Sequence, residues 1–220
     1  MEVRGVTPPI LFHFGPVEVT GTVVYSAVTS GGLITLALLV RRGLLQSPSA
    51  WPVAAEMLVE HFEDLMRDMF GCDPRPYSPL VVTLALFIAA ANLIGLVPGL
   101  HSPTADFSTT AALAIIVFLA VPYYGIRAKG LRGYLRHYLQ PTPLLLPFEI
   151  ISEVSRTLAL AVRLFGNVMS EELVLAVLLS LAGLLVPVPI MMLAVLTSVV
   201  QAYIFAVLTV VYLSAAVRHR

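Results

Sequence analysis

A stretch of 45 residues without a single formally charged side chain, residues 173–217, constrains this chain more than any other feature. A helix crosses a bilayer core with about 20 consecutive apolar residues, so the stretch is long enough for two crossings. It contains VPVP at residues 186–189, and two prolines this close cannot lie inside one unbroken helix. We therefore expect a helix end, a turn, and a new helix over residues 190–217.

The rest of the chain has a membrane composition as well. Of its 220 residues, 58% are hydrophobic and 12% are charged, whereas soluble domains have about 25% charged residues. Thirteen basic residues balance 13 acidic ones, which leaves no basic surface for nucleic acid. A single cysteine, Cys72, excludes an intrachain disulfide and a cysteine-ligated zinc site. Residues 1–15 lack the apolar run of a cleavable signal peptide, and we expect neither a cofactor nor a metal.

Charge-free intervals predict a single all-α, polytopic membrane domain with about five membrane helices. The four predicted spans besides 190–217 cover residues 19–40, 78–98, 107–126 and 144–182. Residues 53–70 differ, because apolar and charged side chains alternate there at helical spacing. This pattern predicts an amphipathic helix in the membrane interface beside Trp51, or alternatively a helix packed on a soluble partner.

Basic residues predict the orientation of the chain in the membrane. Cytoplasmic loops carry an excess of Lys and Arg, and the loops between them carry few. Five spans satisfy this rule with the C-terminus cytoplasmic and the N-terminus outside. The ten basic residues on the cytoplasmic side are then Arg41, Arg42, Arg67, Arg75, Arg127, Lys129, Arg132, Arg136, Arg218 and Arg220.

The predicted span over residues 144–182 is too long for an upright helix. Its 39 residues would measure about 58 Å, roughly twice the thickness of the hydrocarbon core. Residues 148–181 contain no proline and only one glycine, Gly166, so a strongly tilted helix is favoured over a broken one. With residues 190–217 it would form a tilted hairpin that turns a broad side to a neighbour.

Polar side chains follow one side of this long helix. On a helical wheel six of them fall within a sector of about 80°. The strip cannot face lipid, since an arginine at mid-membrane costs about 3 kcal/mol on insertion scales. Small residues beside it, Ser155, Ala159 and Gly166, would let another helix approach closely. The six are Glu149, Glu153, Arg156, Arg163, Asn167 and Glu171.

Arg163 is the most informative residue of this strip. It lies far from the predicted ends of the span, and no acid stands within one helical turn of it. It either snorkels to an interface or finds its carboxylate partner on another chain. Its guanidinium does not lose its proton at accessible pH, so it can hold a carboxylate ionised and block a proton path, but cannot relay protons. A self-contained transporter would need an acid in the same chain, and a passive anchor would need no such strip.

Several motifs resemble the a subunit of bacterial rotary F-type ATP synthases. They are AVRLFGNVM at residues 161–169, EIISE at 149–153, QAYIFAVLTVVYL at 201–213, NLIGLVP at 92–98 and SPTADFSTT at 102–110. The resemblance runs from about residue 79 to the C-terminus. It implies a non-catalytic, multi-pass stator subunit of the bacterial inner membrane. This subunit would carry ions past a c ring, and the ions would be protons or, alternatively, sodium. Its other partners would be the b-subunit stalk, the remainder of the synthase, and lipid.

The resemblance also implies roles for individual residues. Arg163 takes the position of the essential arginine, with the polar residues Asn167 and Gln201 beside it. Glu172 matches an acid of the outward half-channel, with Asp106 near its mouth, and Glu149 and Ser152 match the cytoplasmic half-channel. Some relatives pair the acid with a histidine on the last helix, where this chain has Ala194. The histidines present are expected to be ordinary polar residues: His13, His61, His101, His137 and His219.

Overall fold

The computed structural model describes residues 10–14, 17–46, 50–71, 73–97, 100–139, 146–182 and 187–217. In these ranges six α-helices follow a short antiparallel β-hairpin, so the prediction of an all-α membrane fold is confirmed. The hairpin, β1 (Ile10–Phe14) paired with β2 (Val17–Thr20), was not predicted. It takes up the first two residues of the predicted first span, and α1 (Gly21–Gln46) begins directly after it.

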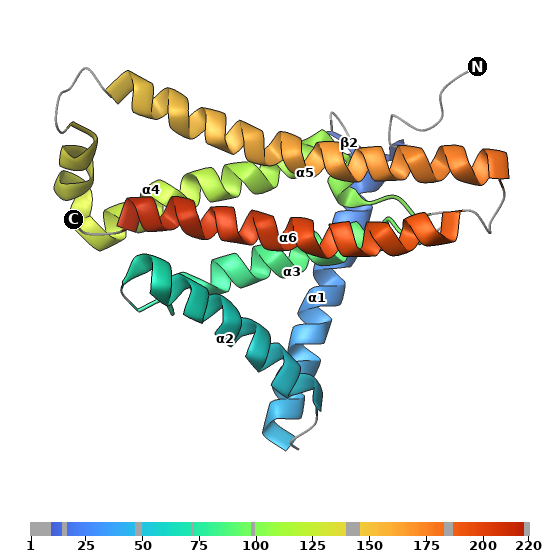
Figure 1. Ribbon diagram of the computed structural model, residues 1–220, viewed down its shortest axis with the longest axis horizontal. Coiled ribbons are helices and arrows are strands. Elements are labelled where there is room, and N and C mark those ends of the chain that lie inside the picture. The colour runs from blue at the N-terminus through green and yellow to red at the C-terminus, as the bar shows by residue number, and fades with distance from the viewer. Residues whose placement is uncertain are drawn as a thin grey trace.

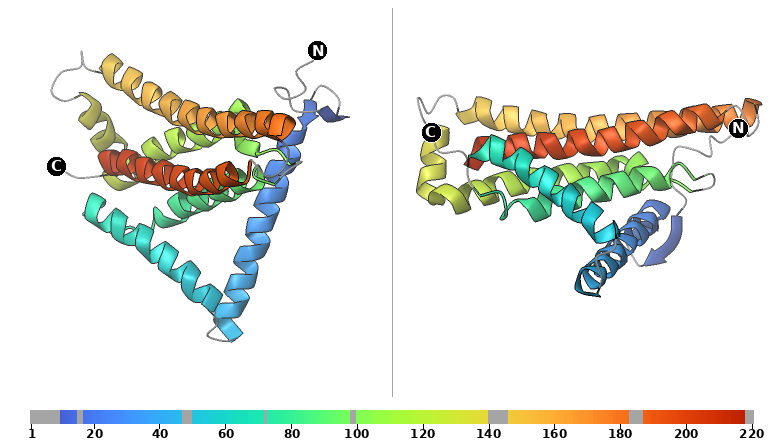
Figure 2. Two further views of the ribbon diagram at one scale, coloured as in Figure 1. Left: turned by 45° about the vertical axis from the view of Figure 1, so that its right-hand side comes forward. Right: turned by 60° about the horizontal axis from the view of Figure 1, so that its bottom comes forward.

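Two long helices form one layer of the molecule, as the right-hand view of Figure 2 shows. They are α5 (Leu146–Ala182) and α6 (Pro187–Val217), about 55 Å and 46 Å long at 1.5 Å per residue. The helix α6 begins three residues before the predicted start at residue 190, because proline is tolerated in the first turn of a helix. The turn at residues 183–186 lies outside the described residues.

The second layer consists of α3 (Ser78–Ile94) and α4 (Phe107–Leu139), which pack under α5 and α6 (Figure 2). The third predicted span ended at residue 126, but α4 continues to Leu139. It does so in two pieces, because Gly130 has φ 74° and ψ 159° and interrupts the helix. Glycine reaches this backbone region without the steric cost that a Cβ would add. Between the two layers, residues Pro103–Ala105 form a single 3-10 turn, η1.

Figure 1 shows α1 running steeply across the direction of α5 and α6. Four helices are long and apolar enough to cross a membrane, and α3 is a shorter apolar helix. In the most apolar 18-residue stretch of the first of the four, only 6% of the residues are buried within the chain. Such exposed apolar surface fits a lipid environment. The four segments are Gly21–Arg42, Phe107–Leu131, Pro147–Leu181 and Val188–Val217.

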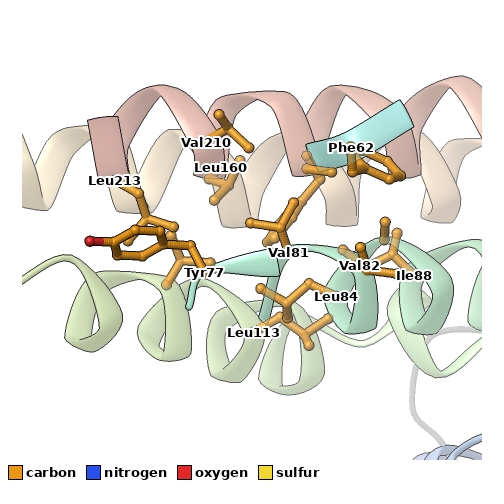
Figure 3. Close-up of a cluster of buried hydrophobic side chains, with 14 of the residues drawn as sticks. Phe62, Tyr77, Val81, Val82, Leu84, Ile88, Leu113, Leu160, Val210 and Leu213 are labelled. Atoms are coloured by element: carbon orange, nitrogen blue, oxygen red, sulfur yellow. The ribbon is translucent and has the colours of Figure 1, made fainter. Parts of the chain in front are cut away.

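The amphipathic helix is α2 (Ala50–Phe70), and its second half covers the core of the chain. Phe62, Met66 and Phe70 are buried on its apolar side, and the helix packs against α3 and α6. Its charged side chains stay at the surface. Figure 3 shows Phe62 above Val82 and Ile88 of α3, so this face is covered by the same chain.

Candidate functional site

Arg163 lies on the outer side of α5, away from the layer formed by α3 and α4. The neighbouring side chains of Leu160, Ala161 and Leu164 are buried, whereas Val162 and Arg163 are exposed. Among the residues that the structure describes, no carboxylate lies within ion-pairing distance of Arg163. A Cβ atom on Gly166, three residues further on, would meet nothing within 4 Å. The surface around the guanidinium is therefore open to a second molecule.

The polar residue one turn after Arg163 joins the two arms of the hairpin. Asn167 on α5 donates a hydrogen bond from Nδ2 to Oε1 of Gln201 on α6, at 2.9 Å. Gln201 is buried, with 5% of its surface exposed, whereas Asn167 is exposed. The amide of Gln201 thus holds Asn167 beside Arg163 on the outer face. We call Arg163, Asn167 and Gln201 the central strip.

A second polar contact joins the hairpin arms one turn further along. Thr197 on α6 donates a hydrogen bond from Oγ1 to Oε1 of Glu171. The polar side of α5 therefore continues past Asn167 with a carboxylate, and Thr197 was not among the predicted site residues. Asn167 and Glu171 are four residues apart, so their side chains stack on one face of the helix.

Glu172 points to a different neighbour, the loop before η1. Its Oε1 accepts a hydrogen bond of 2.6 Å from the backbone N–H of Ser102, and its Oε2 lies 3.6 Å from Nδ1 of His101. The side chain of Glu172 is 23% exposed and that of His101 is 59% exposed. His101, expected to be an ordinary polar residue, is thus the nearest basic group to this acid in the described structure.

Hydroxyl and amide groups hold this loop against α3. Ser102 donates a hydrogen bond from Oγ to the carbonyl of Ala91 at 2.9 Å, and Thr104 donates one from Oγ1 to Oδ1 of Asn92 at 2.5 Å. Gly95 permits the close approach, because a Cβ there would lie 2.6 Å from Cβ of Ser102 and 3.1 Å from Oε1 of Glu172. We call His101, Ser102 and Glu172 the η1 cluster.

Asp106 directly follows η1 and links α1 to the start of α4 at the same end of the molecule as the η1 cluster. Its Oδ2 accepts a hydrogen bond of 3.0 Å from Thr22 on α1, and its Oδ1 accepts one of 2.9 Å from the backbone N–H of Ser108. The second bond satisfies a free N–H in the first turn of α4. Asp106 is half-buried and lies at the same end of the molecule as Glu172, since η1 packs against both α4 and α5.

Glu149 and Ser152 occupy the opposite end of α5. Glu149 is exposed in the first turn of the helix, and Ser152 is half-buried. Fourteen residues separate Glu149 from Arg163, or about 21 Å along the axis, and Glu172 lies about 13 Å beyond Arg163 in the other direction. The structure therefore places the predicted acids in two groups with the central strip between them.

The sequence motifs pointed to the central strip but missed two of the three members of the η1 cluster. Ser102 stood inside a quoted motif and His101 directly before it, yet only the folded chain brings them to Glu172. Ala194, the position at which the resemblance implied a histidine in some relatives, is a buried residue of α6. Within the described residues, no group of three or more His, Cys, Asp or Glu side chains is placed to hold a metal ion.

Comparison with known proteins shows the family of this chain. Residues 23–214 match the family model described as "ATP synthase A chain". The chain is 45% identical to ATP synthase subunit a 1 of Hahella chejuensis, over 97% of this chain and 91% of that protein. It is 47% identical to ATP synthase subunit a 2 of Pelobacter propionicus, over 96% and 93%. The chain belongs to the ATP synthase A-chain family, as a multi-pass, non-catalytic membrane subunit.

Proposed function

We propose that this chain is the ion-translocating stator subunit of a bacterial rotary ATP synthase and that Arg163 faces the carboxylate of a c-subunit ring. One observation carries the proposal: Arg163 is exposed in the middle of the membrane-length helix α5 and has no carboxylate partner among the described residues. An arginine in a low-dielectric environment needs a counter-charge, so this surface requires a partner that brings one. The open space at Gly166 leaves room for a helix to approach.

The guanidinium would act on the ring carboxylate without changing its own protonation. Its permanent positive charge favours the ionised form of a carboxylate within a few ångströms. A ring site opposite Arg163 would therefore release its proton, and a neutral site could not pass without exchanging. Rotation becomes directional if protons reach the ring on one side of Arg163 and leave on the other. Asn167, held by Gln201, would keep this surface polar and positioned.

Two separate groups of acids support two offset paths. Glu172, with Asp106 at the same end, would serve the outward half-channel, and Glu149 with Ser152 the cytoplasmic one. The two groups lie on opposite sides of Arg163 along α5. In this arrangement the N-terminus is outside, the C-terminus is cytoplasmic in the bacterial inner membrane, and the b-subunit stalk binds elsewhere on the chain.

The other function classes have weaker support. A self-contained channel or transporter would pair Arg163 with an acid of its own chain, and in the described ranges none reaches it. A passive anchor would have no use for a charge on an apolar face. Proton transport is favoured over sodium because Glu172 contacts a histidine, a residue that exchanges protons near neutral pH.

ATP-driven lumen acidification by the complete synthase in proteoliposomes tests the proposal. Arg163→Ala should abolish it, whereas Arg156→Ala should retain it, because Arg156 lies on the same polar side two turns earlier with Glu153 three residues away. Normal pumping by the Arg163→Ala complex would refute the assigned role. Repeating both assays with and without sodium separates the two ions, since a sodium-coupled complex would need sodium and would not acidify the lumen.

A further inference from the structure

The acid that we assign to the outward path, Glu172, lies beside a histidine of the loop before η1, His101. We propose that His101 is the residue that takes protons from the outer solution and passes them to Glu172. This inference rests on the proposed function and extends it, because it supplies the proton donor that Ala194 cannot provide. His101 and Ser102 belong to the loop between α3 and η1, so the histidine reaches the acid without any contribution from α6.

The two carboxylate oxygens of Glu172 have different partners. The backbone N–H of Ser102 donates to Oε1 at 2.6 Å, so that oxygen is occupied as an acceptor. Oε2 faces Nδ1 of His101 at 3.6 Å, just beyond direct hydrogen-bond range. A small side-chain movement or one bridging water would connect them. The proton therefore has one defined place to arrive, Oε2.

Exposure decreases along this route. The His101 side chain is 59% exposed and the Glu172 side chain is 23% exposed, so the histidine meets solvent first. The other charged group near η1, Asp106, is engaged with Thr22 and the N–H of Ser108. The helices α3 and α6 contain no charged side chain, and Ala194 fills the position on α6 that relatives give to histidine. Within the described residues His101 is thus the one titratable neighbour that Glu172 contacts.

The transfer balances without any other reactant. A proton from outer water binds the imidazole, which becomes a cation beside the ionised carboxylate. The Nδ1–H bond then breaks and an Oε2–H bond forms, which leaves a neutral imidazole and a neutral carboxylic acid. The acid passes its proton inward and returns to the carboxylate. Imidazole suits this step because its charge changes between about pH 5 and 8.

The test is ATP synthesis by reconstituted complete synthase, driven by a constant membrane potential, with the lumenal pH varied between about 5 and 8. The lumen corresponds to the outer side. His101→Gln keeps a hydrogen-bonding side chain but cannot carry a proton, so its rate should fall at least about threefold at neutral pH and recover in acid. His101→Lys supplies a fixed positive charge and should be slow at every pH. His61→Gln is the matched control, because His61 stacks on Tyr203 and its ring contacts are aromatic.

Each outcome has a separate meaning when Arg163→Ala is measured in the same series. A His101→Gln profile with the same pH dependence as wild type would overturn the role of His101, while an inactive Arg163→Ala complex would leave the proposed function standing. An active Arg163→Ala complex would refute the proposed function itself. A wild-type rate that follows sodium and ignores lumenal pH would overturn the histidine relay and the choice of protons over sodium, but not the role of Arg163. Assembly of each complex, checked by its ATPase activity, shows that the variants have folded.

Discussion

The central strip and the η1 cluster differ in whether their charged side chain has a partner within the described chain. In the η1 cluster, the carboxylate of Glu172 contacts a backbone N–H and an imidazole of its own chain. In the central strip, the guanidinium of Arg163 is exposed and, within the described residues, has no ionic partner. A buried or membrane-embedded charge is stable only when it is paired or hydrogen-bonded. The η1 cluster is therefore complete within the chain, whereas the central strip would be completed, in the proposed function, by another molecule.

Removing the charge of Arg163 should both slow ATP synthesis and open a passive ion leak. Arg163→Ala should lower coupled ATP synthesis by about a hundredfold, since it deletes the charge that we propose ionises the ring carboxylate. It should also raise proton leak through membranes stripped of the soluble ATPase sector, because the barrier between the two paths is gone. Proton flux under an imposed potential measures this leak. A leak unchanged from wild type would break the distinction between the two regions.

Glu172→Gln should slow transport without opening a leak. The variant keeps the hydrogen bond from the Ser102 N–H but cannot accept a proton, so synthesis should fall by about tenfold at neutral outer pH. Glu56→Gln on the exposed side of α2 is the control and should match wild type. If the Glu172→Gln rate equals that of wild type at every outer pH, this acid is not on the outward path.

Gly95→Ala should disturb the η1 cluster without touching a charged group. The added Cβ would lie 2.6 Å from Cβ of Ser102 and so push the loop away from Glu172. We expect about a threefold loss of synthesis at neutral outer pH, with less loss in acid. Gly31→Ala on α1, where the new Cβ meets nothing within 4 Å, controls for the loss of a helical glycine. Equal rates for both variants would mean that the loop need not contact Glu172.

Gln201→Leu should have the smallest effect, on stability. It removes the acceptor of the Asn167 hydrogen bond from a buried position, which should cost about 0.6 to 2 kcal/mol. The thermal midpoint of the purified complex measures the loss. Adding Asn167→Leu should then cost little more, because the two side chains act as one pair. Fully additive losses would show that the hydrogen bond does not couple the hairpin arms.

Much of the fold could be predicted because its signals are local. Charge-free intervals located the apolar helices, and the proline pair correctly separated α5 from α6. The helix ends differ from the predicted span ends where a boundary depends on backbone detail. The helix α4 continues past residue 126 and changes direction at Gly130, and α6 starts at Pro187, which its first turn accommodates. The β-hairpin was missed because its two strands are only five and four residues long.

The site divides in the same way. The spacing of the polar residues along α5 was enough to predict that Arg163 and Asn167 lie on one side of the helix. The structure places both side chains at the surface. No helical periodicity could pair Asn167 with Gln201, since 34 residues and a turn separate them. Nor could it find the partners of Glu172, because Ser102 is 70 residues away in the sequence.

By itself, the sequence determined that this is a helical membrane protein with Arg163 far from either end of a membrane-length helix. The physical reason is that charge is so costly in a bilayer that its few positions reveal both the spans and the exceptional residue. Only the tertiary structure showed that Gln201 bonds to Asn167, the neighbour of Arg163. It also showed that the loop before η1 brings His101 to Glu172. Such contacts depend on how the helices pack and where a glycine lets a loop approach, and neither is a property of any single segment.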